Sequence, residues 1–205
     1  MTATEIDESA LSLSRDLASS RGLHNLDFAV EDVHALSFAD DAFDVVHAHQ
    51  VLQHVGDPVQ ALREMRRVAA PGGVVAARDA DYAGFIWFPM LPELDHWLDL
   101  YRRAARANGG EPDAGRRLLA WARAAGFDDI TVTTSNWTYA NPEDRARWGG
   151  MWADRILESA LARQLVDSEM ATSSDLQAIS DGWKRWAADG DGWYLVPHGE
   201  IIARA

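Results

Sequence analysis

The stretch from Phe43 to Gly73 constrains the fold of this chain more than any other part of the sequence. Phe43 to Ala48 is a short, mostly apolar run, as expected for a strand that is covered on both faces. Asp57 and Pro58 then supply a helix N-cap and a first helical residue. Apolar residues follow at helical spacing, namely Val59, Leu62, Met65 and Val68. The stretch predicts one strand-helix-strand unit, and such units build parallel sheets.

The same unit ends in a way that predicts a second strand. Arg66 and Arg67 fall in the last helical turn, where they oppose the helix dipole. Pro71, Gly72 and Gly73 end the helix, and the apolar run Val74 to Ala77 begins the next strand. These residues favour an α/β protein.

At these residues the sequence resembles a known family. The phrase FADDAFDVVHAHQVLQHV, followed by the helix and the Pro-Gly-Gly turn, is similar to class I S-adenosylmethionine-dependent methyltransferases of the type 11, quinone-biosynthesis-like subgroup. The resemblance covers nearly the whole chain. It implies a Rossmann-like sheet that is mostly parallel, with an antiparallel last strand and a helical insertion before that strand. It also implies S-adenosylmethionine as cofactor and a small-molecule methyl acceptor, which the resemblance does not identify.

The composition of the chain limits the classes of partner that it can bind. The formal charge of −13 disfavours nucleic acid and anionic membrane surfaces, because both attract positive charge. The chain has no cysteine and hence no thiolate metal site. It also lacks a long apolar run, so we expect a cytoplasmic protein with no membrane partner. Its 205 residues favour one domain.

The N-terminal part predicts a strand at Thr2 to Ile6, a helix that starts at Asp7 or Glu8, and a strand at Leu26 to Val30. In doubly wound sheets, ligands bind at the C-terminal ends of the strands. By that rule Glu5, Asp32 and the His49-Gln50 turn should share one edge of the sheet.

The resemblance gives these positions roles in holding the donor. It implies that Glu5, with Ile6 beside it, binds the ribose hydroxyls, and that Asp32 bonds the adenine amino group. The remaining donor contacts that it implies are Val33 against the ring and Ala48, His49 and Gln50 at the methionine end. Taken singly, Glu5 is also consistent with a solvated residue near the start of the chain, and Asp32 with a turn cap.

The chain departs from the family at its N-terminus. The family begins with a strand and a glycine-rich loop, but here Gly22 is the only glycine before Gly56. We therefore expect an N-terminally truncated form of the fold that binds the donor poorly. Loss of that strand would leave two unpaired strand edges. Three outcomes are then open: the two flanking strands pair with each other, a second chain fills the gap, or the fold is weakened.

The resemblance implies that the region after the strand that ends near Arg78 covers the acceptor pocket. Asp79, Asp81 and Tyr82 are therefore the candidates to face the acceptor. The alternative is that Arg78 and Asp81 pair at the surface and that the neighbouring aromatic residues are core. Two carboxylates without further ligands do not make a metal site, so none is predicted.

We divide the single domain by expected role. Residues 1–80 form the donor-binding half, 81–113 the acceptor-side cover, 114–137 a helix and strand, 138–190 the helical insertion, and 191–205 the final strand. All nine tryptophans follow residue 80, and their helical spacing in the insertion is more typical of a core than of a binding site. The final strand is expected at an edge of the sheet, interrupted at Pro197 to Gly199.

Histidines provide the candidate catalytic groups. Methyl transfer chiefly requires alignment of the two reactants, and a base is needed only if the acceptor loses a proton. His49 and His54 lie nearest the expected methyl position, although a surface role for His54 fits equally well. His47 is predicted to be a buried strand residue.

Two readings remain. The first is S-adenosylmethionine-dependent methyl transfer to a small molecule, impaired by the absent glycine loop. The alternative is a non-catalytic methyltransferase-like module for binding or dimerisation, with a second copy of the chain as a homodimer partner. A nicotinamide-dependent dehydrogenase is disfavoured because the dinucleotide glycine fingerprint is absent.

Overall fold

The computed structural model describes residues 1–205 as an alternation of strands and helices. The strands are β1 (Thr2–Glu5), β2 (Asp27–Val30), β3 (Phe43–His49), β4 (Ala69–Ala80), β5 (Ile86–Phe88), β6 (Ile130–Tyr139) and β7 (Trp193–Arg204). The helices are α1 (Glu8–Ser20), α2 (Pro58–Val68), α3 (Pro92–Ala107), α4 (Leu118–Ala124), α5 (Pro142–Glu158), α6 (Ala160–Asp167) and α7 (Ser173–Ala188), with short 3₁₀ turns η1 (Tyr82–Gly84) and η2 (Gly115–Arg117). None of the helices combines the length and the apolar character that crossing a membrane would require.

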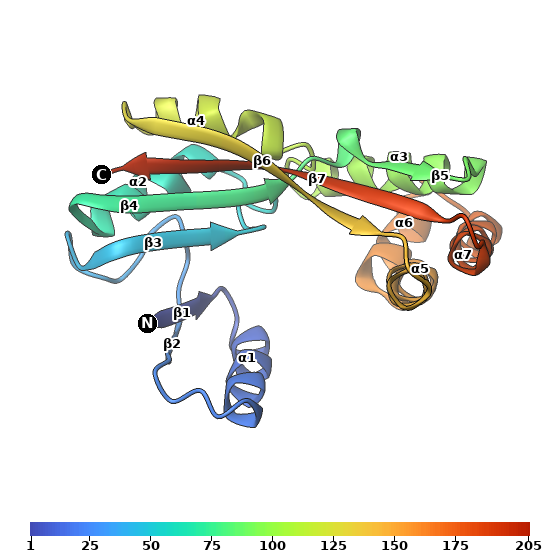
Figure 1. The fold of residues 1–205 in the computed structure, drawn as a ribbon, viewed down its shortest axis with the longest axis horizontal. Helices are drawn as coiled ribbons and strands as arrows, with labels where there is room; N and C mark the ends of the chain where they lie inside the picture. Colours follow the sequence, from blue (N-terminus) through green and yellow to red (C-terminus); the bar gives the residue numbers. More distant parts are fainter.

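Five of the strands form one sheet (Figure 1). Its order is β3-β4-β7-β5, and β6 pairs with β7. β3 is parallel to β4, whereas β7 is antiparallel to β4, β5 and β6. Four strands therefore share one direction and only the last strand opposes them, which confirms the predicted Rossmann-like sheet.

The position predicted for the last strand was wrong in two respects. β7 is central rather than at an edge, because it pairs with β4 as well as with β6. It is also continuous from Trp193 to Arg204. Pro197 is tolerated because the β4 ladder ends at His198 and the β5 ladder begins at Leu195, so no ladder bond needs the N–H that proline lacks. Its carbonyl accepts a hydrogen bond from the Asp81 amide at 3.0 Å.

The β3-α2-β4 unit forms as the sequence predicts. The Asp57 side chain accepts a hydrogen bond from the Gln60 amide and caps α2, and Pro58 opens the helix. The inward face of α2 is buried against the sheet, with Ala61, Leu62, Met65 and Val68 at most 2% exposed. This unit fixes where the C-terminal ends of β3 and β4 lie.

Two cores divide the molecule. One joins α2 and α4 to the centre of the sheet. The other is aromatic and lies at the far end of β7, where α3, α5, α6 and α7 gather (Figure 1). Trp97, Trp183 and Trp186 are fully buried in it, and Trp97 and Trp183 meet edge to face at 5.0 Å between centroids. The prediction that these tryptophans form a core is confirmed.

The N-terminal residues form a small unit of their own. β1 pairs only with β2, in parallel, and the pair makes a separate two-stranded sheet with α1 beside it (Figure 1). No hydrogen bond joins β1 to β3, so the two strands have not closed up on each other. Several apolar side chains of this region face solvent, including Ile6, Leu13 and Val30 on the unit and Val45 on β3. Each sheet therefore carries an unpaired strand edge.

Candidate functional site

The C-terminal ends of β3 and β4 meet at a turn built around Gln50. His49 ends β3 in register with Arg78 of β4. Gln50 then adopts a left-handed backbone conformation, with φ of 54°, and its amide donates to the Arg78 carbonyl at 2.7 Å. This turn points the Gln50 side chain towards the middle of β7.

His198 of β7 receives that side chain. It is 1% exposed, its Nδ1 donates to the Val196 carbonyl at 3.1 Å, and its Nε2 accepts from the Gln50 amide at 2.9 Å. Burial, followed by the positive charge of Arg78, lowers the pKa of His198 to about 4. His198 is therefore neutral at physiological pH and acts as a fixed acceptor that orients Gln50.

His49 lies beside this pair but makes no hydrogen bond through its ring. Its ring centroid lies 5.9 Å from Trp137 and 6.5 Å from His198. Partial burial, then the charge of Arg78, lowers the pKa of His49. The neutral imidazole can thus accept a proton near neutral pH. His47 also faces solvent, so the prediction that it is buried was wrong: alternate strand residues share a face, and this face of β3 is uncovered.

Asp79 is a buried carboxyl group near the end of β4. It is fully buried; Oδ1 accepts from the Gln53 amide at 2.9 Å, while Oδ2 has no partner. Burial raises the pKa of Asp79 to about 7, against the opposing effect of the Gln53 and Leu52 backbone hydrogen bonds. The Gln53 side chain continues the chain of contacts, because its carbonyl accepts from the Ala80 amide at 3.2 Å and its NH₂ lies 3.0 Å from His54 Nε2.

That contact assigns the tautomer of His54. Because the Gln53 carbonyl is used by Ala80, its NH₂ must donate to His54 Nε2, which leaves the ring proton on Nδ1. Burial, then the positive charge of Arg155, lowers the pKa of His54. His54 is therefore a neutral hydrogen-bond donor rather than a free base.

A hollow of about 230 Å³ opens next to His54. Its polar lining comes from Gln53 and His54 after β3, Tyr101 and Asn108 around the end of α3, and Arg155 and Gln164 of α5 and α6. Ala105, Gly110, Ala160 and Leu161 complete the wall. Elements far apart in the sequence thus converge on the C-terminal edge of the sheet, where α/β proteins bind their ligands.

The other predicted acceptor-side residues are engaged within the protein. Asp81 is 8% exposed and forms a bidentate pair with Arg116, both contacts being 2.6 Å. Arg78 pairs with Glu200 at 3.0 Å instead, so the alternative of a surface Arg78-Asp81 pair is wrong. Tyr82 stacks on Tyr101, with 4.3 Å between centroids, and its hydroxyl donates to that of Tyr101 at 2.9 Å. Tyr82 thus adjoins the hollow through Tyr101.

The remaining predicted donor residues lie on the N-terminal unit. Glu5 ends β1 and is exposed, as is Ile6. The Asp32 carboxylate accepts from the His34 amide at 2.9 Å and contacts its Nδ1 at 2.7 Å, as a turn cap does. Val33 is partly buried and packs against the same core cluster that contains buried Ala48 of β3. The chemistry of this set suits a nucleoside, but no hydrogen bond or ion pair joins residues 1–33 to the His49-Gln50 turn.

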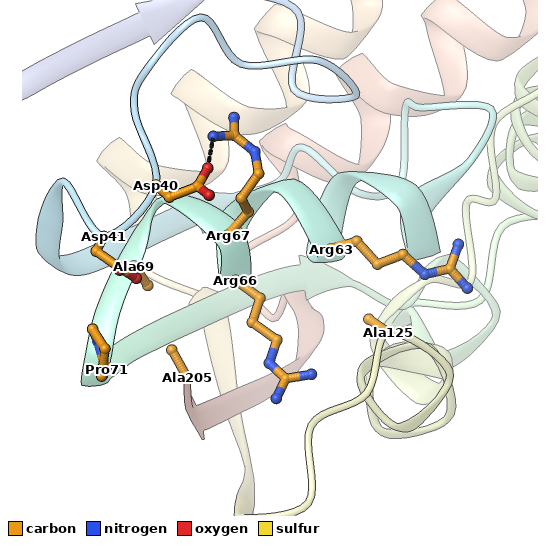
Figure 2. Close-up of a pocket in the computed structure, with 9 residues that line it drawn as sticks. All are labelled: Asp40, Asp41, Arg63, Arg66, Arg67, Ala69, Pro71, Ala125 and Ala205. Carbon is orange, nitrogen blue, oxygen red and sulfur yellow. Dashed lines mark hydrogen bonds and ion pairs between the residues drawn. The ribbon is translucent and has the colours of Figure 1, made fainter.

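A larger hollow lies at the opposite edge of the sheet and does not belong to this site. Figure 2 shows it beside the C-terminal end of α2, between Asp40, Arg66 and Ala125. Its arginines have structural partners: Arg67 pairs with Asp40 at 2.7 Å, and Arg63 donates to the last turn of α4 at 3.3 Å. Arg66 stands 5.5 Å from the Phe127 ring. These contacts explain the charges of the hollow without a ligand.

The comparisons with known proteins agree with this arrangement. A family model described as a methyltransferase domain matches residues 1–77. An uncharacterized methyltransferase of Schizosaccharomyces pombe is 34% identical over 184 residues, which cover 88% of this chain and 64% of that protein. Over most of its length the chain is therefore similar to methyltransferases. It spans less than two thirds of the length of this yeast relative.

Two further matches support the family and the fold. The ubiquinone/menaquinone biosynthesis C-methyltransferase UbiE of Bdellovibrio bacteriovorus is 41% identical over 75 residues, which cover 37% of this chain and 32% of UbiE. The structure of YcgJ from Bacillus subtilis superposes with a TM-score of 0.59 at 18% identity, over 99% of this chain and 81% of that one. This second match shows that the two proteins share the fold.

Four residues of the site were missed from the sequence, namely His198, Gln53, Tyr101 and Arg155. His198 and Gln50 are 148 positions apart, and only the β4-β7 ladder brings them together. Gln53, Tyr101 and Arg155 carry no motif either. For Gln53 alone a sequence signal existed, since it lies next to His54 in the turn that the strand-helix-strand unit predicts.

Proposed function

We propose that this methyltransferase domain transfers a methyl group from S-adenosylmethionine to a small molecule. The observation that carries the proposal is the hollow beside His54, at the C-terminal edge of β3 and β4, in a chain of this family. The bound donor would supply an electrophilic methyl group on a sulfonium. Glu5, Asp32 and the His49-Gln50 turn are the residues we propose to hold it, and the solvent-facing oxygens of Glu5 suit ribose hydroxyls.

The chain's own residues position the acceptor and handle its proton. Gln50 is held by His198, so the turn after β3 keeps one conformation. Tyr101, His54 and Gln53 shape the wall next to it. His49 is the side chain we propose as the base, because its ring nitrogens are unbonded and its neutral form is favoured.

Donor binding by this chain is expected to be weak. The edges that carry Glu5 and His49 are not joined by any hydrogen bond, so a bound donor would have to order the N-terminal unit against β3. We expect calorimetric titration with S-adenosylmethionine to give a dissociation constant weaker than about 100 μM. Glu5→Gln should weaken donor binding further. Asp27→Asn should not, because Asp27 begins β2, whereas Glu5 lies beside the residue that ends it. Micromolar affinity would contradict this expectation.

Transfer itself is tested with radiolabelled donor at millimolar concentration and a panel of small acceptors. Complete absence of labelled product, with the donor shown to be bound, would refute the proposed function. Labelled product would support it, however weak the donor binding.

His49→Gln should separate the base from a merely structural residue. For an acceptor that loses a proton, we expect kcat to fall about 10- to 100-fold. Because the pKa of His49 is lowered, wild-type activity should persist below the ordinary histidine range and then decline as the imidazole is protonated. The variant should lack that acidic decline. His24→Gln, in the exposed loop after α1, is the control, and identical pH profiles for His49→Gln and wild type would contradict the role.

A second candidate function is favoured by one specific observation. The unpaired edges of β1 and β3, together with exposed Val30 and Val45, would suit a non-catalytic module for binding or dimerisation. Sedimentation velocity with and without the donor distinguishes the two candidates. A stable dimer that neither binds the donor nor transfers methyl groups would favour the module.

A further inference from the structure

The charge of the residues that line the hollow beside His54 differs from that of the chain as a whole. The proposed function does not explain this difference. The chain as a whole has 32 acidic residues against 19 lysines and arginines. Yet the lining of this hollow contains one cation, Arg155, and no aspartate or glutamate. In so acidic a protein, a hollow without carboxylates is a place where an anion meets little repulsion.

Arg155 is available to a ligand. Its guanidinium has no carboxylate within ion-pair distance and makes no hydrogen bond to the protein. It stands 5.0 Å from the ring centroid of Trp152, a side chain that is only 2% exposed. This stacking holds the guanidinium over a rigid surface and leaves its N–H groups free for a planar anion.

Two further donors line the same hollow. His54 carries its proton on Nδ1, because Nε2 accepts from Gln53. The Tyr101 hydroxyl accepts from Tyr82 at 2.9 Å, so its own hydrogen has no acceptor in the protein. Asn108 and Gln164 instead pair their amides with each other at 2.9 Å and form a neutral wall. The unsatisfied groups of the hollow are thus donors.

Size limits the ligand. At about 230 Å³ the hollow is smaller than the range of roughly 300–1,000 Å³ that is typical of drug-sized ligands. Tyr101, which is 8% exposed, and Leu161 contribute apolar lining for a ring. We propose that this hollow binds a small, single-ring aromatic acid, with its carboxylate on Arg155 and its ring against Tyr101. The inference rests on the proposed function in one respect, since it names the class of the methyl acceptor.

Binding can be measured without the methyl donor. We would titrate 4-hydroxybenzoate and its neutral isostere 4-hydroxybenzamide into the wild-type chain by calorimetry. The acid is expected to bind about ten-fold more tightly than the amide, as one charge-assisted contact allows. Arg155→Met should abolish that difference and leave amide binding unchanged. Arg163→Met, an exposed arginine of α6 that does not line the hollow, removes the same charge and should preserve the difference.

Each outcome of these titrations either supports or contradicts the proposed ligand. Equal binding of acid and amide, no binding of either, or equal losses in the Arg155 and Arg163 variants would overturn the inference. Methyl transfer to neutral acceptors alone would overturn it and leave the proposed function standing. Selective binding of the acid without any transfer would support the site and count against the function. Near-ultraviolet circular dichroism establishes that the Arg155 variant is folded.

Discussion

Replacing Gly199 by alanine is expected to lower the free energy of unfolding by about 3–5 kcal/mol, because there is no room for a Cβ atom. Gly199 lies in β7 against the backbone of Gly115 in η2, and a Cβ would overlap the Gly115 carbonyl. The fit is tight from both sides, since a Cβ on Gly115 would lie 2.7 Å from the Gly199 nitrogen and 2.9 Å from the Asp79 carbonyl oxygen. These are backbone atoms, which cannot rotate away as a side chain can.

Gly190→Ala is the matched control for this effect. Nothing lies within 4 Å of a Cβ at that position, so its stability should stay within about 1 kcal/mol of wild type. Urea unfolding followed by tryptophan fluorescence measures both variants. The Gly199 variant should also loosen the Asp81-Arg116 pair, because Arg116 follows Gly115 directly. A Gly199 variant as stable as the control would show that β7 and η2 can separate at little cost.

The second large effect is expected for Asp79→Asn and depends on pH. The native protein keeps the Asp79 proton up to about pH 7, since burial raises its pKa, whereas the unfolded chain loses it near the ordinary value of 3.8. Between these values the native state binds the extra proton, so wild-type stability falls as the pH rises. The loss amounts to about 4 kcal/mol once Asp79 is fully ionised. Asparagine has no proton to lose, so the variant should escape this loss.

The measurement compares the free energy of unfolding of the two proteins at each pH, so that the contributions of all other titrating groups cancel. Near pH 5 the variant should already be more stable by about 1.6 kcal/mol, because the unfolded wild-type chain has lost the Asp79 proton there while the native protein still keeps it. At about pH 8.5 the variant should be more stable by up to about 4 kcal/mol. Asp154→Asn, at an exposed position of α5, should show no such change with pH. A constant difference between the Asp79 variant and wild type would mean that Asp79 is ionised in the native state throughout.

Asp79 illustrates why part of the site could be found from the sequence and part could not. Its place at the end of a strand follows from the strand-helix-strand pattern, and the family resemblance implied that it lies on the acceptor side. Its burial does not follow from the pattern, because the cover comes from η2 and β7, more than 30 residues away in the chain. Without the cover, the unusual pKa and the contact with Gln53 cannot be foreseen.

For the N-terminal unit too, the sequence predicted the local elements but not how they pair. The sequence predicted β1, α1 and β2 within a residue or two, because their caps and apolar runs are local signals. Whether β1 would pair with β3 depends on two edges that are distant in sequence. In the structure they do not pair, and the residues that the family resemblance assigns to one donor site are divided between two sheets.

By itself the sequence determined the α/β class and the parallel β3-α2-β4 unit, because hydrophobic period, caps and turn residues act over a few positions. The direction of the last strand was implied only by the family resemblance. Only the tertiary structure decided that β7 lies at the centre of the sheet, that His198 orients Gln50, and that Arg155, His54 and Tyr101 line one hollow. These contacts join residues up to 148 positions apart. They depend on how sheets and helices pack, and no local pattern in the chain encodes that packing.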